Sequence, residues 1–97
     1  MRPVHLSDLH YAATMLATLP PEQRTSMFFR ELTHADIADR YRKRLRKAHP
    51  EFGLGTLTSA FSGQPTHEIH PPHDVDYLQS MLVVVSGLLH RAGHNLA

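Results

Sequence analysis

Apolar residues recur every three or four positions along most of this chain, which is the spacing expected of amphipathic helices. With Ser7 as the N-cap, the first repeat predicts a helix from about Asp8 to Thr18. Pro20-Pro21 end this helix, because the residue before a proline avoids the helical conformation. Neither glycine nor proline then occurs until His49-Pro50, so a long helix is predicted from Pro21 to Ala48.

The long helix carries one continuous apolar stripe and two apolar residues outside it. The stripe consists of Phe28, Leu32, Ala35, Ala38, Tyr41, Leu45 and Ala48. Phe29 and Ile37 lie on a second face, so we expect this helix to pack against more than one neighbour.

After the long helix, the sequence predicts a tight reversal and a short helix. Gly53 and Gly55 can adopt the backbone conformations that a reversal needs, and Phe52 and Leu54 are expected to pack back into the core. A short helix is predicted from Thr56 to Ser62. The following segment, 64–73, carries three prolines and three histidines and predicts an exposed loop.

The last predicted helix begins after Asp74 as its N-cap and runs to about Arg91. Its middle, MLVVVSGLL, is apolar on every side apart from Ser86. Three consecutive valines would also suit a buried strand, but helical spacing is kept over about four turns, and the chain offers no second strand. Such a helix is either the centre of a bundle or half core and half interface.

Together these elements predict one all-α domain over residues 1–97, a compact four-helix fold with two long helices, one of medium length and one short. We expect the second and fourth helices to pack together, the first to close one side, and the third to cap the turn. A chain of this length can leave apolar surface to be covered by a second copy or by another protein.

Charge and composition exclude several classes of function. Ten Lys and Arg against nine Asp and Glu give a net charge of +1, so the chain as a whole is not drawn to polyanions. The absence of cysteine excludes disulfides, thiolate metal sites and cysteine nucleophiles. No segment has the length and hydropathy of a signal peptide or a membrane span, so we expect a cytoplasmic protein without a membrane partner.

A local concentration of positive charge is the first candidate site. Six cations fall within eight residues with no acid between them: Arg40, Arg42, Lys43, Arg44, Arg46 and Lys47. They can contact nucleic acid, or they can be a solvated helix end in which Asp36 and Asp39 pair with Arg40 and Lys43. The helix from Thr56 to Ser62 has no Arg, Lys, Asn or Gln with which to read bases, so a helix-turn-helix is not predicted.

Histidines followed by aspartate make the second candidate site, in the segment 67–76. Imidazole and carboxylate groups can hold zinc or nickel, and the candidate ligands are His67, His70, His73 and Asp74. The spacing is not that of a metal-binding helix, because Pro71-Pro72 would break it. His90 and His94 are four residues apart, but Gly93 makes a continuous helix there doubtful.

Signatures of enzymes are otherwise missing from the sequence. The glycines at positions 53 and 55 follow a predicted helix and do not form a phosphate-binding loop after a strand, and no serine sits in a nucleophile elbow. We therefore expect a protein that is not an enzyme and needs no cofactor.

The chain resembles a group of short bacterial proteins, alphaproteobacterial in origin, of similar length and without an assigned function. The resemblance is carried by ADRYRKR (Ala38 to Arg44), AHP (Ala48 to Pro50), GLGTL (Gly53 to Leu57) and DVDYL (Asp74 to Leu78). It implies a single compact helical domain and transfers no activity, cofactor or site residue.

Three hypotheses of function follow from the sequence. The leading one is a small non-enzymatic helical protein that acts through protein-protein contacts, as a homodimer formed through its apolar last helix. The second is a nucleic-acid-binding accessory protein that uses the cations of residues 40–47, and the third is a metal-binding protein that uses the segment 67–76.

Overall fold

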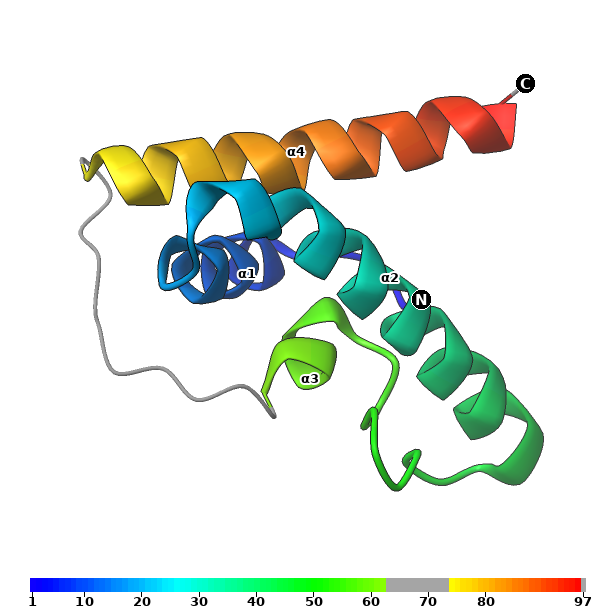
Figure 1. Cartoon of the computed structure of the whole chain (residues 1–97). Helices are drawn as coiled ribbons and strands as arrows, with labels where there is room; N and C mark the ends of the chain where they lie inside the picture. Colours follow the sequence, from blue (N-terminus) through cyan, green and yellow to red (C-terminus); the bar gives the residue numbers. More distant parts are fainter. Residues whose placement is uncertain (63–73, 97) are drawn as a thin grey trace.

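The computed structural model describes residues 1–62 and 74–96, and every regular element in these residues is an α-helix. The helices are α1 (Leu6–Ala17), α2 (Pro21–Leu45), α3 (Leu57–Phe61) and α4 (Val75–Leu96) (Figure 1). The predicted all-α fold with four helices is confirmed. The segment predicted as an exposed loop, 64–73, lies outside the described residues.

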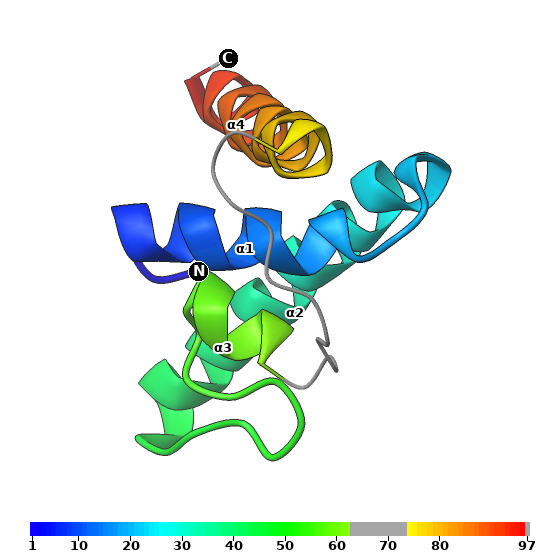
Figure 2. The same ribbon diagram turned by 90° about the vertical axis from the view of Figure 1, so that its left-hand side faces the viewer.

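Helix α1 is in the middle of the molecule. It packs against α4 on one side, against α3 on the other and also against α2 (Figure 2). The prediction that the first helix merely closes one side is therefore wrong. Ala12 and Ala13 are fully buried, and these small side chains allow neighbouring helices to approach α1 closely.

The core is built where α1, α2 and α4 meet, and α3 closes it on the side away from α4 (Figure 2). Phe28 of α2 and Phe61 of α3 are both buried, and their rings stack with centroids 6.5 Å apart. A methyl group added at Gly87 of α4 would lie only 2.5 Å from a carbon of the Phe28 ring. Helix α4 can therefore lie this close to α2 only because residue 87 is a glycine.

The start of α1 differs from the prediction. The helix begins at Leu6, and the main-chain amide of His5 donates a hydrogen bond of 2.9 Å to the Asp8 carboxylate. The N-cap is thus His5 and not Ser7. The Asp8 carboxylate also accepts hydrogen bonds from the backbone amide and the hydroxyl of Thr58, which ties the start of α1 to α3.

Helix α2 ends at Leu45, three residues before the predicted end. Arg46 takes a left-handed conformation (φ 57°), and its amide donates to the carbonyl of Arg42. The chain then reverses through a turn in which His49 and Gly53 exchange main-chain hydrogen bonds. The early end leaves Leu45 half exposed and Ala48 exposed, so neither belongs to the core as the apolar stripe had suggested.

The turn after α2 rests on an aromatic stack. The Phe52 ring lies between those of His34 and His49, at centroid distances of 4.0 and 4.7 Å. Leu54 is 49% exposed, so the prediction that it packs into the core is wrong. Gly55, at φ 90°, presses directly on Asp39 of α2, where a side chain would meet the backbone.

The other two helices start as the sequence indicates. The Thr56 hydroxyl accepts from the amide of Ser59 and caps α3, and Asp74 accepts from the amide of Asp76 at the start of α4. Helix α4 continues through Gly93 to Leu96, beyond the predicted end at Arg91. Its valines are helical, so the alternative of a buried strand is wrong.

Buried charged groups join the helices. Arg24 of α2 is 3% exposed and donates at 3.1 Å to the carbonyls of Leu16 and Leu19, which satisfies the end of α1. The same guanidinium pairs with Asp76 of α4 at 2.9 Å. One side chain thus connects α1, α2 and α4.

A second group of charges joins α2 to α4 and to the first residue. Asp36 pairs with Arg91 at 2.6 Å and with the amino group of Met1. Asp39 is buried and pairs with Arg42 and Lys43. The predicted pair of Asp39 with Lys43 is confirmed. The predicted pair of Asp36 with Arg40 is wrong, because Asp36 pairs with Arg91 of α4 and with Met1.

We expect Gly87→Ala to lower the free energy of unfolding by about 2 kcal/mol, because the added methyl group overpacks Phe28. Gly93→Ala in the same helix is the matched control. Nothing lies within 4 Å of a methyl group there, and alanine favours a helix over glycine, so stability should rise by up to about 1 kcal/mol. Urea unfolding measures both. Equal effects of the two substitutions would contradict the close approach of α4 to Phe28.

Acid should destabilise the fold through Asp8, Asp36 and Asp39. Burial raises the pKa of each carboxyl, but hydrogen bonds from Thr58, Arg91 and Arg42, respectively, outweigh burial and hold the pKa below its ordinary value. The unfolded chain therefore binds more protons in acid. The stabilisation, complete above the unfolded pKa of about 3.9, is lost as the pH falls through the lower folded values.

We expect Asp8→Asn to cost about 2 kcal/mol near pH 7, because the charged acceptor of the Thr58 hydrogen bonds is lost. The variant should also lose less stability than the wild type between pH 4 and pH 2. Urea unfolding over this pH range tests both expectations. Glu51→Gln, on the exposed turn, serves as the control and should change neither value.

Candidate functional site

The outer face of α4 carries a continuous line of exposed apolar side chains. Successive members are separated by three, four, three and four residues: Val75, Leu78, Leu82, Val85 and Leu89. Each is between 46% and 71% exposed. We call this line the α4 seam. Its spacing is that of the contact positions of a coiled coil, where apolar residues face a second helix.

The opposite face of the same helix is packed into the molecule. Tyr77, Ser80 and Val84 are buried, and Gly87 lies against Phe28. The Tyr77 hydroxyl also lies 2.8 Å from Nδ1 of His10 on α1. Within the described chain, α4 is therefore half core and half exposed, and the alternative in which it forms the centre of a bundle is wrong.

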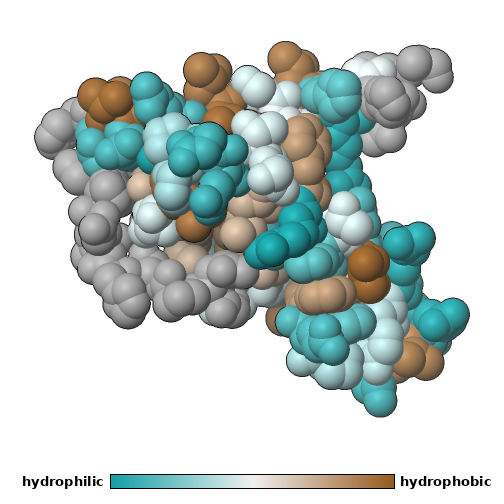
Figure 3. All heavy atoms as spheres, in the orientation of Figure 1, coloured by the Kyte–Doolittle hydropathy of each residue, from teal (hydrophilic) through white to brown (hydrophobic). Residues whose placement is uncertain are grey.

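The seam forms a substantial apolar surface. Hydrophobic side chains protrude along the edge that α4 forms (Figure 3). Together the five seam residues expose on the order of 500 Å² of apolar side chain, which is at the upper end of the largest apolar patch on a monomeric protein. An ordinary protein interface buries about 800 Å² on each partner. The seam together with the polar residues around it would therefore approach the area that one partner buries in an ordinary interface.

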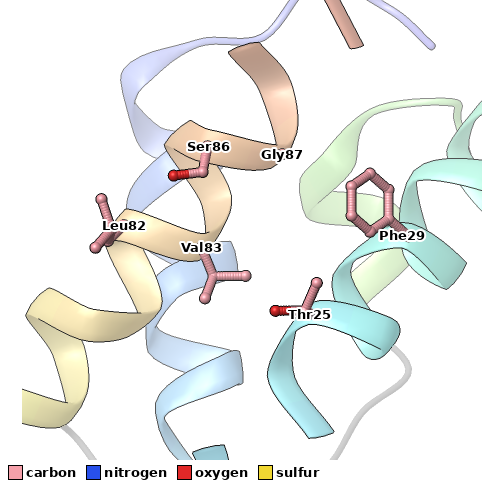
Figure 4. Close-up of a pocket in the computed structure, with 6 residues that line it drawn as sticks. All are labelled: Thr25, Phe29, Leu82, Val83, Ser86 and Gly87. Atoms are coloured by element: carbon pink, nitrogen blue, oxygen red, sulfur yellow. The ribbon is translucent and has the colours of Figure 1, made fainter. Parts of the chain in front are cut away.

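A groove of about 340 Å³ lies beside the seam, between the first turns of α2 and the middle of α4. Its lining consists of Thr25, Phe29, Leu82, Val83, Ser86 and Gly87. Val83 and Thr25 point towards each other across the groove (Figure 4). Phe29 is 38% exposed, and its ring packs edge-on against His90. The groove adds an apolar depression to which Leu82 of the seam also contributes.

The charges of α4 lie at its two ends. Asp76 is in the first turn, preceded by Asp74, whereas His90 and Arg91 follow the seam. No acidic or basic residue occurs from Tyr77 to Leu89. Asp76 pairs with Arg24 and Arg91 pairs with Asp36, so these charges are balanced within the chain, and the middle of α4 is apolar.

The structure divides the six cations of the predicted nucleic-acid site into two sets. Arg42 and Lys43 bind the buried Asp39 carboxylate at 2.9 and 3.3 Å, so they stabilise the fold. Arg40, Arg44, Arg46 and Lys47 form no ion pair with any carboxylate in the described residues. Arg40 and Arg44 line a pocket of about 350 Å³, which also contains Ile37, Tyr41 and His49.

The predicted metal site is only in part within the described residues. His67, His70 and His73 lie outside them, and Asp74 serves as the N-cap of α4. Helix α4 passes through Gly93, so the expected break between His90 and His94 is wrong. No group of three or more histidine or carboxylate side chains in residues 1–62 and 74–93 is placed to hold a metal ion.

The apolar pattern of α4 does not by itself separate the seam from the core face. The pattern combined inward-facing Tyr77 and Met81 with outward-facing Leu78 and Leu82 in one broad stripe. The strict alternation of three and four residues from Val75 to Leu89 was the signal that separates the two faces.

Comparison with known proteins places the chain in a family. No described helix is long and apolar enough to cross a membrane. No curated protein and no solved structure matches the chain. A family model for a domain of unknown function, DUF7742, matches residues 2–88. Because this match covers most of the sequence, the chain belongs to the DUF7742 family.

Proposed function

We propose that this protein is a non-enzymatic helical protein that works by self-association, with the α4 seams of two copies packed against each other. The observation that carries the proposal is the regular exposure of Val75, Leu78, Leu82, Val85 and Leu89 on a helix whose other face is already packed. Burying them between two copies would remove on the order of 1,000 Å² of apolar surface from water.

The helix dipole favours an antiparallel pair. The ion pairs Arg24–Asp76 and Asp36–Arg91 balance the charges at the two ends of α4 within each copy, so these charges do not select an orientation. In an antiparallel pair, the positive end of each helix dipole lies beside the negative end of the other, whereas a parallel pair sets like ends together.

The seam fits this orientation in one register. With Leu82 level with Val85 of the second copy, Leu78 is level with Leu89, and Val75 with Ala92. All of these positions belong to the same three-four repeat. The polar positions beside the seam are Gln79 and Ser86, which carry no charge to oppose close approach. In this register, a second copy therefore covers the apolar line with apolar side chains.

We expect the wild-type protein to elute with about twice the mass of one chain in gel filtration with light scattering at micromolar concentration. Leu82→Gln combined with Leu89→Gln should give a single-chain mass and a normal helical spectrum, because both side chains point to solvent in one copy. Leu54→Gln is the control. It removes a half-exposed leucine on the turn before α3, far from α4, and should leave the mass unchanged (Figure 1). A wild-type protein with the mass of one chain would refute self-association.

The orientation can be read from single cysteines, because the native chain has none. In the antiparallel register, Val75 lies about 25 Å along the helix axis from its own equivalent in the second copy. Val75→Cys alone should therefore fail to form a disulfide-linked dimer under mild oxidation. A mixture of Val75→Cys and Ala92→Cys should form one, because these positions are level. Efficient linkage of Val75→Cys to itself would show a parallel pair.

A further inference from the structure

The basic pocket at the C-terminal end of α2 consists of Ile37, Arg40, Tyr41, Arg44 and His49. Arg40 and Arg44 are one helical turn apart and thus lie on the same side of α2. Both are exposed, and neither forms an ion pair or a hydrogen bond with a described residue. Two guanidinium groups therefore stand beside a small hollow with their donors available.

The fold holds the His49 ring in place at this pocket. Its Nδ1 accepts hydrogen bonds from the main-chain amides of Glu51 and Phe52, at 3.0 and 3.1 Å. A ring nitrogen that accepts carries no proton, so the neutral ring bears its proton on Nε2. Because the ring also packs edge-on against Tyr41 at 4.8 Å, the fold fixes its position. The pocket is thus lined by two cations, a positioned imidazole ring and a tyrosine side chain.

The surrounding charge is positive. Asp39, the carboxylate nearest in sequence to Arg40, is occupied by Arg42 and Lys43. Arg46 and Lys47 follow on the exposed turn and add two further cations. The Glu51 carboxylate lies on the same turn, and the carbonyl end of α2 carries about half a negative elementary charge. The four cations outweigh both, and none of them forms an ion pair with a described residue. The pocket should therefore attract an anion with several acceptor oxygens.

We propose that this pocket binds a phosphodiester of single-stranded nucleic acid, with Arg40 and Arg44 on the phosphate and the adjoining base against Tyr41 and Ile37. An aromatic ring and an apolar wall beside cations are the features with which proteins hold single strands. Base-specific recognition of a duplex is not supported, because α3 offers no side chain suited to reading base edges. The pocket lies at the end of α2 that points away from α4, so it does not depend on self-association (Figure 1).

The test is fluorescence anisotropy of a labelled oligothymidylate of about 12 nucleotides, titrated with the intact protein at about 50 and about 200 mM salt. We expect binding that weakens with salt. Arg40→Gln combined with Arg44→Gln should weaken binding about tenfold at the lower salt and reduce the log-log salt slope by about 1.4. These side chains are exposed, so circular dichroism should show an unchanged fold.

Arg30→Gln is the control for a loss of net charge, because Arg30 is exposed on α2 but lies outside the pocket. It should weaken binding less than Arg40→Gln alone or Arg44→Gln alone. An equal loss of affinity in Arg30→Gln and in the pocket variants would show an effect of net charge alone and overturn the proposal. The absence of binding at the lower salt would overturn it as well. A strand of the same length without bases should bind several-fold more weakly. Equal binding of that strand, or binding only to phosphatidylserine vesicles, would overturn the nucleic-acid assignment.

Discussion

The contact between Gly87 of α4 and the ring of Phe28 sets the geometry of this protein. It brings the two long helices together at a distance that no larger residue would permit, with α1 packed beside them. Since this contact fixes which side of α4 faces the core, it also fixes which side faces outwards. The exposed line from Val75 to Leu89 is thus a direct consequence of how the core is packed. A helix apolar on both sides can bury only one of them in so small a domain.

Buried charged groups also hold the helices together. Arg24 satisfies the carbonyl end of α1 and reaches Asp76, while Asp36 reaches Arg91 near the other end of α4. Each long helix is therefore held to the other near both ends of α4, with apolar packing between. Asp39 pairs with the amino group of Met1 and also binds Arg42 and Lys43 of the basic cluster. The same ion pairs that stabilise the fold decide which cations remain available to a ligand.

Much of the fold could be predicted from local patterns, because helical spacing, prolines and caps act over a few residues. The end of α2 could not, since it depends on the left-handed Arg46 and on Gly55 pressing against Asp39 from the following turn. The role of Arg24 was equally hidden, because its partners lie on two other helices. For the candidate site, the sequence identified the basic cluster and the excess of apolar residues in α4. The packing of the helices was needed to show which of these cations pair with a described carboxylate and which apolar residues of α4 are exposed to solvent.

The two proposed surfaces have a joint consequence. A pair of copies held through α4 carries two basic pockets, each at an end of α2 that points away from the helix that joins the copies. A strand that reaches both pockets would bind the second as an intramolecular step, at an effective concentration set by the length of strand between them. The affinity for long strands would then exceed that for short ones without any new contact. Self-association would in this way convert a weak site for one phosphate into a tight site for a polymer.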